Sequence, residues 1–309
     1  MLNFVNTKRL SLLGFSLFFL LPVLTTAYGQ TPNPAPGQKP DPAHGPAHDP
    51  AHAPAHAPNP APKSAHRFLV SAHRGDHTHA PENTLKAYAN AIEAGADYVE
   101  IDLRTTRDSQ LVIMHDASVN RMTAGTGLVR DMNWDSLRLL RVRDKSHPQW
   151  GEYEIPTFDQ VLELCRGKIG IYLDFKNADP AVAYKAIQRF GMEDQVIVYI
   201  NAPQQFYGWR RVAPHMPLMV SLPGNVRTAD SLAGFLANYH PDILDGDWDG
   251  YTPEMVTLAT KNGYLVFPDI QGPNESPALW EAAVDKGIRA LQTDHPGDLV
   301  KWLKERSLR

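Results

Sequence analysis

Acidic side chains lie near the ends of two apolar, strand-like segments. Glu100 and Asp102 are separated by one residue, and Asp174 precedes Lys176 with the same spacing. Because side chains alternate along a strand, each pair points to one face. Neighbouring carboxylates repel, and burial adds to that cost unless a cation offsets it. If the three carboxylates converge, they form a site for a hard cation such as Mg2+ or Ca2+; the alternative is a structural ion-pair cluster around Lys176.

Two histidines end further apolar segments. His73 is followed by Arg74, and His115 ends a separate run. In phosphoryl transfer, one imidazole can take a proton from the nucleophile while another gives a proton to the leaving oxygen, and nearby cations stabilise the phosphoryl charge. Together with the three acids, these side chains predict phosphoryl-transfer chemistry.

A regular scaffold must position these residues, and residues 66–309 alternate short apolar runs with helix-like patterns. Strands are expected at 68–72, 98–103, 169–175, 196–200, 218–222, 243–247, 264–269 and 290–293. Helical patterns follow most of them, for example at 83–94, 181–190, 228–239, 253–261 and 277–286. Eight strand–helix units in this length predict an α/β fold, the (β/α)8 TIM barrel, with its active site at the carboxyl ends of the strands.

One further strand is expected at 111–115. Only residues 104–110 separate it from the second barrel strand, and a parallel crossover needs a dozen residues or more. We therefore expect an antiparallel hairpin, turned about 107–109, whose second arm is an addition to the barrel. Such a hairpin would bring His115 back beside Glu100 and Asp102.

Several short segments follow one another along the chain, and together they form a specific pattern. They are His73-Arg74-Gly75, Pro81-Glu82-Asn83-Thr84, the run 95–103, Thr106-Arg107-Asp108, His115-Asp116, Arg121-x-Thr123-x-Gly125-x-Gly127, Ile155-Pro156-Thr157-Phe158 and Thr293-Asp294-His295-Pro296. In this order they resemble the glycerophosphodiester phosphodiesterase family, part of a superfamily of TIM-barrel phosphodiesterases similar to phosphoinositide phospholipase C. The likeness covers nearly all of 66–309.

The resemblance implies a TIM barrel, one divalent cation, and hydrolysis of a glycerophosphodiester to an alcohol and sn-glycerol 3-phosphate. The expected route is attack by the substrate's own glycerol hydroxyl on phosphorus, followed by opening of the cyclic phosphate by water. The resemblance also implies metal ligands, a general acid and base, and cations that bind the phosphate. It makes Glu100, Asp102 and Asp174 the metal ligands. It makes His73 and His115 the general acid and base, and Arg74 and Lys176 the cations that bind the phosphate.

The chain departs from the family pattern around the metal and in the first loop. Asp174 stands where the family usually has glutamate, so the ion must sit closer to the strand or a water must bridge the gap. The loop after His73 carries Asp76, His77 and His79, which the motif does not require. These residues are spaced loosely like zinc ligands, so a zinc hydrolase is an alternative, although the other histidines of the domain form no comparable cluster.

The seventh strand ends at 267–269 without the tryptophan often found there in the family. Asp247, Trp248 and Asp269 are candidates to contact the alcohol group, with structural roles as the alternative. A lysophospholipid or phosphoinositide substrate, and a secreted binding module without turnover, also stay open. At the start of the first helix, Asn83 is expected to act as the cap and Glu82 to hold the preceding loop.

The first 65 residues are not expected to belong to the barrel. Lys8 and Arg9 precede an apolar run that ends before small residues, which predicts a signal peptide at 1–29 and export to the periplasm or medium, without a stable membrane anchor. Residues 30–65 are rich in Pro, Ala and His and predict an extended linker. The domain is therefore expected at 66–309.

Composition limits the partners of the mature chain. The formal charge is −4, and it becomes −6 when Lys8 and Arg9 leave with the signal peptide. This argues against a nucleic-acid partner that relies on bulk charge, whereas the family resemblance implies a small-molecule phosphodiester substrate. The single cysteine, Cys165, excludes an intramolecular disulfide and is expected in the core. The sequence leaves the oligomeric state open.

Overall fold

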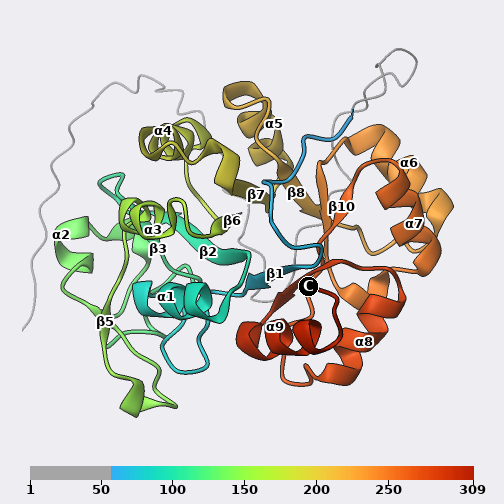
Figure 1. Cartoon of the computed structure of the whole chain (residues 1–309). Coiled ribbons are helices and arrows are strands. Elements are labelled where there is room, and N and C mark those ends of the chain that lie inside the picture. The colour runs from blue at the N-terminus through green and yellow to red at the C-terminus, as the bar shows by residue number, and fades with distance from the viewer. Residues whose placement is uncertain (1–56) are drawn as a thin grey trace, which may run out of the picture. The chain divides into compact units, whose positions relative to one another are not determined.

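Eight parallel strands close into a barrel in the computed structural model, which describes residues 57–309. They are β1 (Leu69–Ala72), β2 (Tyr98–Thr105), β6 (Gly170–Phe175), β7 (Val196–Ile200), β8 (Leu218–Ser221), β9 (Ile243–Asp245), β10 (Leu265–Val266) and β11 (Ala290–Thr293). Their order around the barrel is β10, β9, β8, β7, β6, β2, β1 and β11, and a parallel bridge from Asp269 to Gln292 completes the circle. The predicted TIM barrel is confirmed (Figure 1).

A ring of helices covers the outside of the barrel (Figure 1). It consists of α1 (Leu85–Ala94), α3 (Phe158–Cys165), α4 (Pro180–Phe190), α5 (Pro203–Val212), α6 (Ala229–Tyr239), α7 (Pro253–Lys261), α8 (Pro277–Asp285) and α9 (Pro296–Glu305). Several begin at a side-chain cap: Thr157 and Thr228 each accept the backbone N–H three residues later. The five helices named from the sequence are present, and α3, α5 and α9 complete the ring.

The expected hairpin is also present. β3 (Leu111–Ile113) pairs antiparallel with β2, with Leu103 opposite Ile113. The turn is closed by a hydrogen bond from the Thr106 N–H to the Gln110 carbonyl, and Ser109 within it has φ 67°. β3 is therefore an addition beside the barrel, as predicted.

Residues 116–157 form a small insertion between this hairpin and α3. It contains α2 (Trp134–Leu137) and a two-stranded sheet of β4 (Arg141–Val142) and β5 (Tyr153–Glu154). Its buried apolar side chains pack with Val112 and Met114 into a separate cluster. Short 3-10 turns lie at Val129–Asp131, Pro148–Trp150, Glu193–Gln195 and Trp248–Gly250.

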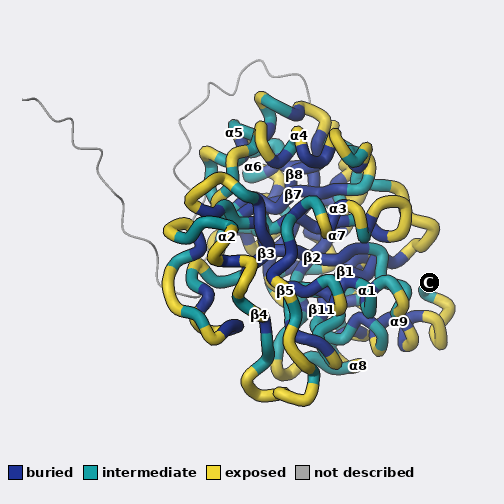
Figure 2. The backbone as a smooth tube through the Cα atoms, turned by 90° about the vertical axis from the view of Figure 1, so that its left-hand side faces the viewer, coloured by how far each residue is buried: buried dark blue, intermediate teal, exposed yellow. Residues whose placement is uncertain are grey.

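Apolar side chains fill the floor of the barrel and leave polar ones at its mouth. Tyr98, at the start of β2, packs edge to face with Phe267 at 5.7 Å between ring centroids, and Tyr172 packs with Phe267 at 6.1 Å. Glu100 follows Tyr98 on the same face of β2, so it lies one layer nearer the mouth. The strands are the most buried part of the chain (Figure 2). Cys165 is buried as expected, which raises the pKa of its thiol to about 12.

Residues 57–65 lie against the barrel. The Asn59 N–H donates to Asp242 Oδ1 at 2.7 Å, and the Tyr98 hydroxyl donates to the Pro62 carbonyl at 3.1 Å. These contacts begin before residue 66, the expected start of the domain. The predicted signal peptide and the linker up to residue 56 lie outside the described residues and stay predictions. Within 57–309, no helix combines the length and apolar character needed to cross a membrane.

Asp97, just before β2, ties both ends of the described chain to the barrel floor. It accepts hydrogen bonds from the Ser64 hydroxyl at 2.7 Å and the Val70 N–H at 2.8 Å. Its carboxylate also lies 2.7 Å from His66 Nδ1 and 2.8 Å from Arg309 Nη1. One buried carboxylate thus joins the segment before β1, the first strand and the last residue.

Replacing Asp97 by asparagine is expected to lower the free energy of unfolding by about 2–4 kcal/mol, because the neutral amide leaves Arg309 without its buried counter-charge. Activity per folded molecule should not change, since Asp97 precedes β2 on the floor side of the barrel, whereas Glu100 and Asp102 lie further along the strand toward the mouth. Denaturant titration measures the loss. Asp135→Asn, at an exposed ion pair with Arg138, is the matched control and should change stability far less. Equal effects of the two substitutions would contradict the prediction.

Candidate active site

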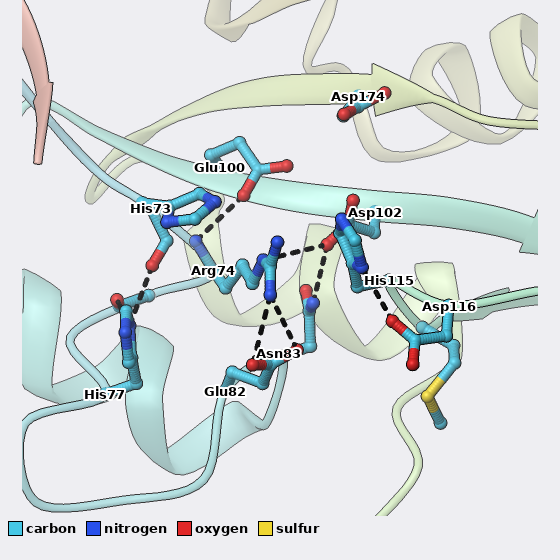
Figure 3. Close-up of polar contacts among 12 residues, drawn as sticks. His73, Arg74, His77, Glu82, Asn83, Glu100, Asp102, His115, Asp116 and Asp174 are labelled. Carbon is cyan, nitrogen blue, oxygen red and sulfur yellow. Dashed lines mark hydrogen bonds and ion pairs between the residues drawn. The ribbon is translucent and has the colours of Figure 1, made fainter. Parts of the chain in front are cut away.

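The three predicted acidic residues converge at the mouth of the barrel (Figure 3). β2 and β6 pair in parallel with Asp102 opposite Asp174, and Glu100 lies two residues earlier on the same face. Within residues 57–309, they form the group of potential metal-binding side chains whose ligand atoms lie within 4.8 Å of one another. Glu100 is 3% exposed and Asp102 is fully buried, so water does little to screen their repulsion.

The electrostatics of this group fit a divalent cation. Burial, followed by the charges of Asp102 and Asp174, raises the pKa of Glu100 well above its ordinary value. Burial acts in the same direction on Asp102, but the surrounding positive charges, led by Lys176, outweigh it and lower its pKa. From the described part of the chain Asp102 Oδ1 accepts no hydrogen bond, although Lys176 Nζ lies 3.1 Å away outside hydrogen-bond geometry. A cation would satisfy this oxygen and offset the repulsion at Glu100.

Asp174 is held from two sides. Lys176 Nζ donates to its Oδ2 at 2.5 Å, and Asn201, just after β7, donates from Nδ2 to its Oδ1 at 2.6 Å. The side-chain oxygen of Gln205 accepts the Asn201 N–H and fixes that residue. Burial acts to lower the pKa of Lys176, but Asp102 and Asp174 raise it above its ordinary value, so the ammonium stays charged. Asn201 is a site residue that the sequence analysis did not identify.

His73 is oriented by an aspartate from the far end of the sequence. β1 and β11 pair in parallel with Ala72 opposite Thr293, and the His73 N–H donates to the Thr293 carbonyl. This register places His73 Nδ1 2.7 Å from Asp294 Oδ1. Because the carboxylate accepts, we infer that Nδ1 carries the proton and that Nε2 can exchange protons with a substrate. Burial acts to raise the pKa of Asp294, but the hydrogen bond from His73 and nearby positive charges lower it below its ordinary value, so the carboxylate stays ionised.

His115 is fixed by the same kind of contact. It follows β3, where the Met114 N–H donates to the Asp102 carbonyl, and the Arg104 guanidinium donates to the His115 carbonyl. Asp116 Oδ1 lies 2.8 Å from His115 Nδ1, and this hydrogen bond is the main cause of the lowered pKa of Asp116. The predicted position of His115 beside Asp102 is confirmed (Figure 3).

Arg74 lies beside the carboxylates in a backbone conformation that is unusual for its type. Its φ is 54°, and its N–H donates to Glu100 Oε2 at 2.8 Å. Its Nη1 donates to both oxygens of Glu82 at 3.1 Å, and its Nε lies 3.8 Å from Asp102 Oδ2. Gly75 continues the turn at φ 81°, where a Cβ would meet the Ala87 carbonyl carbon at 2.8 Å. Glycine is therefore required here, and the turn delivers Arg74 to the site.

The expected cap of the first helix is wrong. Thr84, not Asn83, caps α1, because its side chain accepts the Ala87 N–H. Asn83 has φ 56° and turns inward, where its Nδ2 donates to Asp102 Oδ2 at 2.7 Å while Tyr88 donates to its Oδ1 at 2.8 Å. Asn83 thus orients a proposed metal ligand.

The remaining histidines of the first loop do not gather with His73 into a metal site. Among the described residues, the acidic group above is the one whose ligand atoms are close enough, so the zinc alternative has no geometry to support it. His77 Nδ1 lies 3.0 Å from the His73 carbonyl oxygen, and its Nε2 lies 3.5 Å from Asp294 Oδ1. His77 therefore stabilises the turn after β1. The His79 side chain is exposed.

The candidates for contacting the alcohol group lie on neighbouring segments, where Asp247 pairs with Asp269 in a parallel bridge and the Trp248 N–H donates to the Asp269 carbonyl. Trp248 packs against the outer core, with Lys286 Nζ 4.5 Å from the centroid of its ring. Asp269 lies on the barrel wall, where it accepts a hydrogen bond from Gln292 Nε2 at 2.7 Å, and Asp247 is exposed. These contacts give Trp248 a structural role, and its contact with the alcohol group stays a prediction.

The chain matches the model of the Glycerophosphoryl diester phosphodiesterase family over residues 73–298. A glycerophosphodiester phosphodiesterase of Caldanaerobacter subterraneus is 29% identical over 247 residues, which cover 77% of this chain and 98% of that protein. The probable glycerophosphodiester phosphodiesterase 1 of Mycobacterium tuberculosis is 40% identical over 269 residues, which cover 78% and 94% of the two chains.

Solved structures show the same fold. A glycerophosphodiester phosphodiesterase of Agrobacterium tumefaciens superposes with a TM-score of 0.68 at 25% identity, over 76% of this chain and 99% of that one. A phosphodiesterase of Oleispira antarctica superposes with a TM-score of 0.68 at 21% identity, over 76% and 96% of the two chains. The chain belongs to the glycerophosphoryl diester phosphodiesterase family and is a phosphoric diester hydrolase.

Proposed function

We propose that the enzyme hydrolyses a glycerophosphodiester to an alcohol and sn-glycerol 3-phosphate, with one divalent cation, Mg2+ or Ca2+, held by Glu100, Asp102 and Asp174. The observation that carries the proposal is the pairing of His73 with Asp294 and of His115 with Asp116 beside this buried acidic group. The product named for the Oleispira antarctica structure, sn-glycerol-3-phosphate, supports the choice of product.

The charged side chains would bind and orient the phosphate. When bound, the cation supplies positive charge that stabilises the phosphoryl oxygens in the transition state. Lys176 stays charged between Asp102 and Asp174, so its ammonium can share its contacts with a phosphate oxygen. Arg74 lies on the other side of Asp102 and is held by Glu82. The side chains of Lys176 and Arg74 are thus both positioned before the substrate arrives.

The two histidines would move the protons. One Nε2 takes the proton of the glycerol hydroxyl next to the phosphate, and that oxygen forms a bond to phosphorus. The other imidazole, protonated, gives its proton to the alcohol oxygen as the bond from phosphorus to that oxygen breaks. In the second half of the reaction the histidines exchange roles. The now neutral imidazole takes a proton from water as the water oxygen bonds to phosphorus, and the other imidazole gives its proton back to the glycerol oxygen that attacked first, as the bond from phosphorus to that oxygen breaks. Both histidines thereby return to their starting protonation states. Asp294 and Asp116 stabilise whichever imidazole is charged.

A substrate panel tests the proposed function. Glycerophosphocholine, glycerophosphoethanolamine and glycerophosphoinositol are each expected to release sn-glycerol 3-phosphate to some degree, measured by an enzyme-coupled assay. Chelator should abolish release, and Mg2+ or Ca2+ should restore it, because the acidic group needs a cation to place the phosphate beside it. No release from any of the three with Mg2+, Ca2+ or Zn2+ would favour a binding module. Restoration by Zn2+ alone would contradict the proposed metal.

A further inference from the structure

Arg121, in the insertion, lies between two carboxylates of the active site. Its guanidinium donates to both oxygens of Glu82, at 2.7 and 3.0 Å, and to both oxygens of Asp116, at 2.9 and 3.0 Å. The Glu82 side chain is 13% exposed and the Arg121 side chain 44%, so the contact joins a buried carboxylate to a guanidinium at the surface. A planar guanidinium can make two such bidentate contacts, whereas an ammonium cannot.

Each of these carboxylates also holds a residue of the proposed reaction. Asp116 contacts His115 Nδ1 at 2.8 Å, and Glu82 accepts two hydrogen bonds from Arg74, each of 3.1 Å. A continuous series of hydrogen-bonded side chains therefore runs from Arg74 through Glu82, Arg121 and Asp116 to His115. Figure 3 shows its two ends, with Glu82 beneath Arg74 and Asp116 beside His115.

The loop that carries Arg121 is closely hydrogen-bonded. The Thr123 hydroxyl donates to the Val119 carbonyl at 2.8 Å and accepts the Gly125 N–H at 3.0 Å. Gly127 has φ 121°, a conformation that side chains rarely allow, and its carbonyl accepts the Val119 N–H. The spacing Thr123-x-Gly125-x-Gly127 thus closes a loop on Val119, which is fully buried. These hydrogen bonds hold the loop that carries the backbone of Arg121, and the four carboxylate oxygens then hold its side chain.

We propose that Arg121 is a positioning residue for the hydrolysis, which holds Asp116 so that His115 keeps its Nε2 directed at the substrate. The inference rests on the proposed function and extends it to a residue outside the barrel. Arg121 acts through Asp116 and Glu82 rather than by contact with the reacting atoms. If Arg121 is removed, Asp116 can rotate, whereas Arg74 keeps its own two hydrogen bonds to Glu82. The loss should therefore fall on the proton transfer by His115 and not on substrate binding.

Arg121→Gln is expected to lower kcat for glycerophosphocholine about 10- to 100-fold, as for other residues that orient a site side chain, with little change in KM. Arg121→Lys keeps the charge but not the bidentate geometry, so its kcat should lie between those of the wild type and Arg121→Gln. Millimolar guanidinium should restore part of the activity of Arg121→Ala, because the free ion can occupy the gap between the two carboxylates.

Arg138→Gln is the matched control, since Arg138 lies in the same insertion and forms an exposed ion pair with Asp135. It should leave kcat and KM unchanged. Thermal unfolding of all variants separates positioning from folding: a kcat loss that follows loss of folded protein, without rescue by guanidinium, would overturn the inference. So would a wild-type kcat in Arg121→Gln. A wild-type enzyme without turnover would instead overturn the proposed function itself.

Discussion

Replacing His115 by alanine is expected to leave metal binding intact and to reduce kcat by about 10²- to 10⁴-fold, the usual contribution of a general acid or base. The three proposed ligands come from β2 and β6, and His115 is not among them. Its Nδ1 is occupied by Asp116, so its remaining nitrogen is the one that can serve the substrate. Isothermal calorimetry with Mg2+ or Ca2+ and steady-state kinetics on glycerophosphocholine measure the two effects separately.

His147→Ala is the control for this variant. His147 also lies in the insertion, but its ring stacks on Trp150 at 4.1 Å, away from the acidic group. Its removal should change neither metal affinity nor kcat. Substantial residual turnover in His115→Ala would remove His115 from its proposed role. Loss of metal binding in the same variant would mean that it acts as a ligand instead.

Glu100→Gln is expected to abolish activity and the stabilisation of the fold by metal. In the metal-free protein, burial and the charges of Asp102 and Asp174 oppose the ionised form of Glu100, so a neutral amide of the same shape should not lower the unfolding temperature. Its side-chain oxygen can still accept the Arg74 N–H. With metal at about 100 times its dissociation constant, the wild type should gain about 2.7 kcal/mol, and the variant much less.

Differential scanning fluorimetry of both proteins, with chelator and with added metal, measures these unfolding temperatures. Glu163→Gln, in the exposed ion pair with Arg166, is the control and should respond to metal as the wild type does. Equal gains in unfolding temperature for Glu100→Gln and the wild type would show that the cation binds elsewhere. A strongly destabilised metal-free Glu100→Gln would contradict the electrostatic argument.

Much of the scaffold could be predicted because barrel strands are short, apolar and regularly spaced. The hairpin was predictable from chain length alone, since residues 104–110 are too few for a parallel crossover. The insertion at 116–157 was not predicted, because its two strands have two residues each and its core forms only when distant side chains meet. The helices α5 and α9 were not among the predicted ones; both begin at a proline, and neither Ala202 nor His295 caps its helix with its own side chain.

The site was predictable where alternation along one strand places two side chains on one face, as for Glu100 and Asp102. The residues that orient the site were not. Asp294 meets His73 only when β11 closes against β1, a register that no local pattern contains. The residue type of Asn83 favours a cap position, but its neighbour Thr84 caps α1, and the Asn83 side chain donates to Asp102 instead. The orienting role of Asp116 follows from a side-chain torsion, which the sequence does not specify.

The barrel wall is not equally tight around its circumference. β2 and β6 are paired continuously from Tyr98 to Leu103, directly under the acidic residues, whereas β10 has two residues and meets β11 through the single bridge at Asp269. Opening fluctuations cost least where the fewest hydrogen bonds join neighbouring strands. Opening between β10 and β11 is therefore expected to cost less than opening between β2 and β6. Such motion would leave the spacing of the three carboxylates unchanged, because Glu100, Asp102 and Asp174 all lie on β2 and β6.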